Sequence, residues 1–467
     1  MNAETNSALE HVRELLPWWV TWAGPVTYLL VVSLASMVAS RIVIRVALRG
    51  WDESQDMHWT ERSRRCHPAR IASGLLMLFA PIIAMAFVNL WQSPLDTLSR
   101  KGLLIVTAAV ATASCIPSHV DMLNRILPRA TTTRRWLADM VVIGGLMYPT
   151  LPLTLLLLLL VPREFGHAFV WWLGMSLLFL TAYHHSGGMT LLRVFRLAHP
   201  AGPRLQGIVS RVSQADHTKP PPSFEITWSM LNALALPSRQ QLAFSSAALA
   251  HLNDEQLEAI AAHELGHLAE PKHILWLRSL AGLYPVLFAT ALPAGATFGA
   301  YGALPPIGIV LLLGVFLRRL SRRMEHRADD HAHELDNNTY ACALETIYRM
   351  NGLPATMYAR GTHPQLSDRL AALAYAPSYP RPAPPSRWRA RASVGLGLLV
   401  KLFIVVGATV AQPLLSADDS TTSLHIALAT SYGGPAELES LAAQAATRGD
   451  LPAASRLYSA ALTLRQE

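Results

Sequence analysis

Long apolar segments separated by arginine-rich stretches constrain this chain more than any other feature. Hydrophobic residues make up 51% of the 467 residues and charged residues only 15%. A composition this apolar is typical of a polytopic α-helical membrane protein and not of a soluble protein. About eight membrane segments are expected, at 18–40, 71–91, 102–117, 137–161, 165–183, 279–294, 304–317 and 393–415.

The arginines indicate how these segments are oriented. The net charge is +8, and the arginines cluster at the ends of apolar segments. This placement favours a membrane topology over nucleic-acid binding, so the lipid bilayer is an expected partner and nucleic acid is not. By the positive-inside rule, the loops 41–70 and 118–136 are cytoplasmic and both chain termini lie outside. The predicted location is the bacterial inner membrane, and the oligomeric state stays open.

The segment 279–317 is punctuated by proline and glycine. It is expected to form a two-span hairpin, and because its first arm is short, a re-entrant hairpin is the alternative.

The stretch His-Glu-Leu-Gly-His at 263–267 is predicted to lie on a helix. Asn253 is a suitable N-cap, and Gln256 follows it at the spacing of a capping box. On such a helix His263 and His267 are one turn apart on the same face, so both imidazoles can reach one metal ion. Glu264 is offset around the helix, where a base for a zinc-activated water would sit.

A zinc hydrolase needs three protein ligands and an open position for water. The third ligand is expected in the stretch 321–329, whose sequence is SRRMEHRAD. Glu325 and Asp329 are four residues apart and share a helix face. Glu325 can therefore coordinate the ion while Asp329 accepts the second ring N–H of a ligand histidine.

Short strands are expected before the His-Glu-Leu-Gly-His helix. Phe224, Ile226 and Trp228 alternate with polar residues, 232–236 can pair beside them, and 241–244 is a weaker third strand. The proline-rich stretch 199–203 is expected to be a loop.

Four motifs in this order resemble a known family. SRRMEHRAD after HELGH, with a membrane hairpin between them, resembles the integral-membrane zinc metallopeptidases that include the CAAX prenyl endopeptidases and the bacterial heat-shock membrane protease. Asn232-Ala233-Leu234-Ala235 resembles the NAxA edge-strand motif of that family, and Thr362-His363-Pro364 with Arg369 resembles its HP…R motif. The resemblance covers about 190–375.

The resemblance implies a gluzincin-type site with one Zn²⁺ ion per chain. It implies these roles: zinc ligands His263, His267 and Glu325; general base Glu264; oxyanion donor His363; supporting residues Asp329, beside His263, and Arg369; and substrate-strand residues Asn232, Ala233 and Ala235.

The expected fold is a polytopic α-helical membrane protein with a small α+β zinc protease domain split by a membrane hairpin. Its expected parts are an external tail at 1–17, a five-span membrane domain at 18–183, the first catalytic part at 184–278, the hairpin at 279–317, the second catalytic part at 318–376, a Pro/Arg-rich linker at 377–392, a last span at 393–415, and an external tail with a helical hairpin at 416–467.

Three functions remain open at this point. The first is an endopeptidase that cleaves membrane or misfolded proteins at the cytoplasmic face. The second is a signal-transducing membrane protease that cleaves one cytoplasmic regulator in response to an external cue. The third is a transporter or scaffold without enzymatic activity, which the intact ligand set and the nearly uncharged spans argue against.

Overall fold

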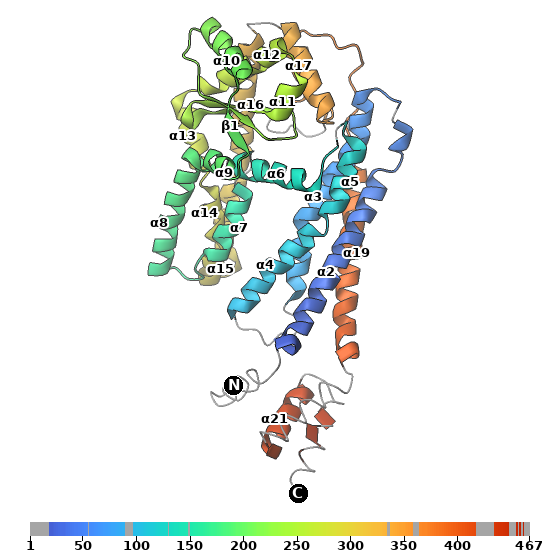
Figure 1. Cartoon of the computed structure of the whole chain (residues 1–467). Coiled ribbons are helices and arrows are strands. Elements are labelled where there is room, and N and C mark those ends of the chain that lie inside the picture. The colour runs from blue at the N-terminus through green and yellow to red at the C-terminus, as the bar shows by residue number, and fades with distance from the viewer. Residues whose placement is uncertain are drawn as a thin grey trace. The chain divides into compact units, whose positions relative to one another are not determined.

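The computed structural model describes residues 18–54, 56–88, 97–128, 130–147, 150–333, 337–357, 364–416 and 434–447, together with 454–455, 457–458 and 461. The chain divides into two compact units (Figure 1). Unit 1 comprises 1–43, 74–115 and 394–467, and unit 2 comprises 44–73 and 116–393.

Unit 1 is helical and contains the larger part of several long apolar helices. Its elements, some of which continue into unit 2, are α2 (Trp18–Ala47), α3 (Trp59–Phe87), α4 (Thr97–Ala113), α19 (Arg387–Ser416) and α21 (Gly434–Thr447). Its main core joins four helices through residues such as Tyr28, Ala84 and Val405. Lys401, on α19, is fully buried in this unit and donates to Ser36 Oγ at 2.5 Å.

The helices of unit 2 include fourteen α-helices and several short turns of other types. The α-helices are α5 (Ile116–Ile126), α6 (Thr133–Val142), α7 (Thr150–Leu160), α8 (His167–Ala182), α9 (Gly188–Val194), α10 (Pro203–Ala215), α11 (Ser246–His251), α12 (Asp254–Leu268), α13 (Lys272–Ala281), α14 (Tyr284–Ala289), α15 (Ala291–Phe298), α16 (Leu304–His333), α17 (Asn337–Met350) and α18 (Leu366–Ala372). The others are the π-helices η3 (Ile143–Met147) and η4 (Tyr183–Gly187) and the 3-10 helices η1 (Asp52–Ser54), η5 (Pro237–Arg239) and η6 (Ala300–Ala303).

Among the described residues, five helices are long and apolar enough to cross a membrane. They are Gly24–Ala47, Trp59–Phe87, Gly102–Ile126, Ala300–His333 and Arg387–Val410. The other three expected spans differ. The segment 137–161 is divided among α6, η3 and α7, α8 has 16 residues, and 279–294 is broken into α13, α14 and part of α15. Glycine and proline residues in these segments disfavour one uninterrupted helix.

A four-stranded sheet of order β1-β2-β4-β3 lies in unit 2. Its strands are β1 (Ala198–Pro200), β2 (Ser223–Ile226), β3 (Ala233–Leu236) and β4 (Gln241–Ser245). β2 and β4 are parallel, and the other two pairs are antiparallel. The three strands expected from the sequence are confirmed. The expectation of a loop at 199–203 is wrong, because β1 ends at Pro200 and α10 begins at Pro203, where proline is tolerated as a first helical residue.

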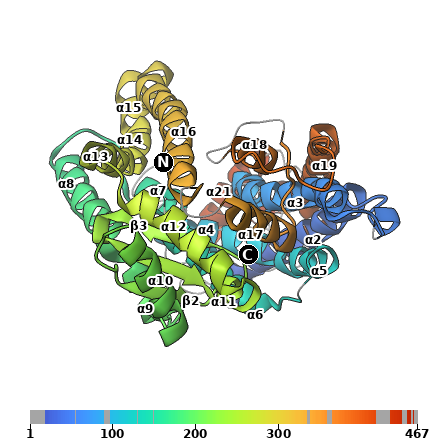
Figure 2. The same cartoon turned by 90° about the horizontal axis from the view of Figure 1, so that it is seen from above.

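Both faces of this sheet are covered, as the alternation of side chains requires. Leu242 and Phe244 of β4 point into a core shared with α10, α12, α17 and α18. Ala243, between them, belongs to a second core that includes Phe224 of β2 and Leu192 of α9. Figure 2 shows α10 and α12 over the strands. The sheet therefore fixes α12 from one side.

The helix α12 begins as the sequence predicts. Asn253 Oδ1 accepts from the Gln256 backbone N–H at 2.8 Å, and the Gln256 side chain accepts from the Asn253 N–H at 3.2 Å, which completes the capping box. This cap satisfies two backbone donors that the helix leaves without partners. Pro271 follows the helix end at Leu268.

The helix α16 packs tightly against α12 at Gly266. A Cβ atom at Gly266 would lie 3.1 Å from the Ala328 Cα atom and 3.2 Å from the Cβ atom of His331. Glycine thus lets the two backbones approach more closely than any other residue would. α16 is a single helix from Leu304 to His333, so the apolar segment 304–317 and the stretch around Glu325 form one continuous element.

Candidate metal and catalytic site

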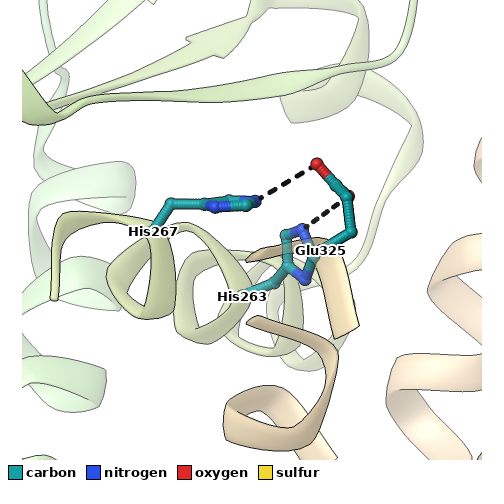
Figure 3. Close-up of side chains that lie close together, drawn as sticks. All are labelled: His263, His267 and Glu325. Atoms are coloured by element: carbon teal, nitrogen blue, oxygen red, sulfur yellow. Dashed lines mark ion pairs between the residues drawn. The ribbon is translucent and has the colours of Figure 1, made fainter. Parts of the chain in front are cut away.

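His263, His267 and Glu325 form a cluster of potential metal ligands. The two histidines lie one turn apart on α12, and Glu325 reaches them from α16 (Figure 3). One ligand atom from each residue lies within 4.8 Å of the other two. The His263 Nε2 atom is 3.9 Å from Glu325 Oε2, and the His267 Nε2 atom is 3.6 Å from Glu325 Oε1. All three side chains are nearly enclosed by protein.

This geometry fits a zinc ion. With ligand bonds of about 2.1 Å in a tetrahedron, the ligand atoms of a zinc site lie roughly 3.4 Å apart. The two nitrogen–oxygen distances here are close to that value. The donor set of two imidazoles and one carboxylate is the one found in catalytic zinc sites that keep a fourth position for water.

His263 is oriented by a buried hydrogen-bond network behind it. Its Nδ1 atom lies 2.8 Å from the hydroxyl of Tyr340, which donates to Asp329 Oδ1 at 2.7 Å. Arg369 donates to Asp329 Oδ2 from Nε at 2.9 Å and to the Tyr340 hydroxyl from Nη2 at 2.6 Å. Burial, assisted by the Asp329 carboxylate, raises the pKa of Tyr340 well above its ordinary value. The phenol therefore keeps its proton.

The network determines which ring nitrogen of His263 carries the proton and which one is free to bind a metal ion. The single phenolic proton of Tyr340 is directed at Asp329, so the hydroxyl accepts from the Nδ1–H group of His263. Nδ1 also lies 3.1 Å from Asp329 Oδ1. With the proton on Nδ1, the Nε2 atom presents its lone pair towards Glu325, as a metal ligand must.

His267 has an equivalent arrangement with a different partner. Its Nδ1 atom lies 2.9 Å from Glu270 Oε1, and the Glu270 side chain is almost completely buried. Burial lowers the pKa of His267, but the hydrogen bond with Glu270 opposes this effect. The charges of Glu264 and Glu325 raise the pKa further, and the net shift is upward. Carboxylates thus make the surroundings of His267 strongly negative, which favours a bound cation.

The other predicted site residues lie on neighbouring elements. Glu264 is buried on α12 beside both histidines. Ala233 and Ala235 lie on β3, the edge strand that is in contact with α12, and Asn232 precedes it. The Asn232 carbonyl accepts from the Ser245 N–H at 2.9 Å, which holds the start of β3 against β4. His363 lies outside the described residues.

Tyr340 and Glu270 were not predicted from the sequence. Glu270 follows His267 by three residues, and this spacing places it within reach of the same helix face, so the sequence did contain a signal for it. Tyr340 belongs to no motif considered above and comes from α17, so only the fold brings it to His263.

Comparison with known proteins agrees with this geometry. A family model described as Peptidase family M48 matches residues 201–376, the part of the chain that contains the whole cluster. A search of curated proteins found no match. The family match confirms the resemblance inferred from the four motifs. Residues 201–376 thus match peptidase family M48, and the chain is a metallopeptidase, a hydrolase that acts on peptide bonds.

Proposed function

We propose that the chain is a membrane-anchored, zinc-dependent endopeptidase that cleaves membrane or misfolded proteins at the cytoplasmic face. The observation that carries the proposal is the His263, His267 and Glu325 cluster inside the family M48 segment. These three residues would hold the zinc ion. When bound, zinc polarises the scissile carbonyl and makes water more acidic.

The side chains of this site divide the remaining tasks. Glu264 accepts a proton from the attacking water and returns it to the leaving amine. Tyr340 and Asp329 hold His263 with its proton on Nδ1, and Glu270 holds His267 in the same way. His363, which the HP…R motif assigns to the developing oxyanion, stays a prediction.

The free edge of β3 suits an extended peptide. β3 ends the described sheet, pairs only with β4 there, and lies against α12. A substrate strand added at this edge would be held by main-chain hydrogen bonds, which tolerate many side chains. Asn232, Ala233 and Ala235 are the residues we assign to this contact.

The placement at the cytoplasmic face rests on α16. Its apolar half exposes large side chains such as Leu311 and Leu312, which suits contact with lipid. Four arginines follow this half: Arg318, Arg319, Arg322 and Arg323. The step from Leu317 to Glu325 is about 12 Å along a helix. The positive-inside rule therefore favours a site just above the cytoplasmic membrane surface.

The decisive experiment replaces the base and keeps the ligands. The Glu264→Gln variant, purified with zinc, should bind one zinc per chain and lose at least about a hundredfold in peptide hydrolysis. Glu255→Gln is the matched control, because Glu255 is exposed in the first turn of the same helix. Hydrolysis by Glu264→Gln at the control's rate would disprove the proposal.

A further inference from the structure

An open hollow of about 100 Å³ lies at the end of the edge strand. Leu236, the last residue of β3, lines it together with Ser238 and Arg239 of η5. The opposite wall comes from the π-helices η3 and η4 and from Gly188 and Met189 at the start of α9. None of the residues assigned above to the zinc site lines this hollow.

The walls of the hollow are built from an unusual backbone. η3 and η4 are both π-helices, a conformation that occurs mostly as single turns within α-helices and frequently at functional sites. They are fastened together where the Tyr183 hydroxyl donates to the Gly145 carbonyl at 2.7 Å. A Cβ atom at Gly188 would lie 2.6 Å from that carbonyl oxygen, so only glycine fits at this contact. The hollow is thus a formed feature of unit 2.

Gln240, next to the hollow, forms a hydrogen bond with α12, the helix that carries His263 and His267. Gln240, which follows η5, adopts a left-handed backbone with φ 50°, which is uncommon for a residue other than glycine. Its side-chain amide donates to the carbonyl of Leu268 at 3.3 Å, and Leu268 follows His267 directly. A peptide strand lying along β3 and continuing past Leu236 would therefore leave the zinc site and reach this hollow.

The polar groups of the hollow favour an anion. Arg239 is half-buried and donates from Nε to the His185 carbonyl at 3.0 Å, which fixes the direction of its guanidinium. Among the described residues, Arg239 makes no ion pair. The lining also contains His184, His185 and two serines, and none of its residues is acidic. A carboxylate entering here would meet an oriented cation and hydroxyl donors.

We propose that this hollow is a specificity subsite that receives an acidic side chain of the peptide substrate, with Arg239 as the residue that binds it. The inference rests on the proposed endopeptidase function and adds a substrate preference to it. The aliphatic wall from Leu146, Met189 and Leu236 suits the methylene groups of a glutamate.

The test uses the full-length zinc-loaded protein in detergent and a set of quenched fluorescent peptides. The peptides share one cleavable sequence and differ only in carrying Glu or Gln at a single position, scanned over four positions on each side of the cleaved bond. We expect one position at which Glu gives about a tenfold higher kcat/KM than Gln, the effect of one charge-assisted contact.

Three variants identify the partner of that glutamate. Arg239→Gln should bring the Glu-to-Gln ratio of kcat/KM to about one, and Arg239→Glu should bring the ratio below one, so that Gln is preferred over Glu at the same position. Lys219→Gln, which removes a positive charge from an exposed residue of the same unit, should keep the full preference.

The possible failures are distinguishable. Cleavage by the wild-type protein without an acidic preference at any position, or a preference that survives in Arg239→Gln, overturns the subsite and leaves the endopeptidase function intact. Wild-type activity equal to that of Glu264→Gln on every peptide overturns the endopeptidase function and the subsite with it.

Discussion

Tyr340→Phe is the most informative single change in the network behind the cluster of His263, His267 and Glu325. The hydroxyl of Tyr340 contacts three groups at once: the His263 Nδ1 atom, an oxygen of Asp329 and a nitrogen of Arg369. Phenylalanine keeps the ring and removes only these contacts. The variant therefore measures how strongly the orientation of His263 depends on the hydroxyl oxygen of Tyr340.

The structure sets the expected size of the effect. Loss of a hydrogen-bonding partner behind a ligand histidine typically weakens metal binding about 10- to 100-fold. Here the His263 Nδ1 atom also lies 3.1 Å from Asp329 Oδ1, so a second acceptor remains in the variant. We therefore expect the zinc Kd to rise by about tenfold, which corresponds to about 1.4 kcal/mol. Arg369 keeps its two hydrogen bonds to Asp329, so the fold should persist.

The assay is competition for zinc against a chromogenic chelator of known affinity. Tyr375→Phe is the matched control, because the Tyr375 hydroxyl contacts Cys342 and not the three candidate ligands. The control should bind zinc as the wild type does. A zinc Kd for Tyr340→Phe within twofold of the wild type would refute the argument that Tyr340 orients His263.

Further predictions concern stability. Gly266→Ala should lower the free energy of unfolding by about 1–3 kcal/mol in thermal denaturation, because the new methyl group meets the backbone at Ala328. Gly207→Ala is its control, since only the end of a side chain lies near, and it should not destabilise. Asp329→Asn should cost about 3–5 kcal/mol, because it leaves the buried Arg369 charge without its carboxylate partner, and equal urea midpoints for variant and wild type would contradict this. Chelation of zinc present at a hundredfold excess over its Kd should remove about 2.7 kcal/mol, measurable as a lower Tm by calorimetry.

Local sequence signals predicted the central part of the catalytic domain well. The start of α12 follows from Asn253 and Gln256, because a capping box depends on residues three apart in the chain. β2, β3 and β4 follow from short alternating patterns. The cluster of His263 and His267 with Glu325 followed from helical spacing together with the resemblance of the stretch 321–329 to a motif of the family.

Features that depend on distant contacts were not predictable in this way. Tyr340 reaches His263 from 77 positions away, and nothing near it in the sequence marks it as a partner. The short strand β1 forms because it pairs with β2, although prolines and a glycine dominate its surroundings. The π-helices at 143–147 and 183–187 form where glycines allow two segments to touch. The residue pattern of one segment does not contain information about such a contact.

Because α16 is continuous, movement of its apolar half also moves Glu325. Glu325 lies about 12 Å beyond the apolar half of the same rigid helix. If the apolar half tilts by about 5°, a straight rod of this length carries the carboxylate sideways by about 1 Å. A displacement of that size at a reacting centre is enough to change a rate by about a hundredfold. A change in the thickness or tension of a surrounding bilayer would thus move the Glu325 carboxylate relative to His263 and His267, and no ligand would be needed.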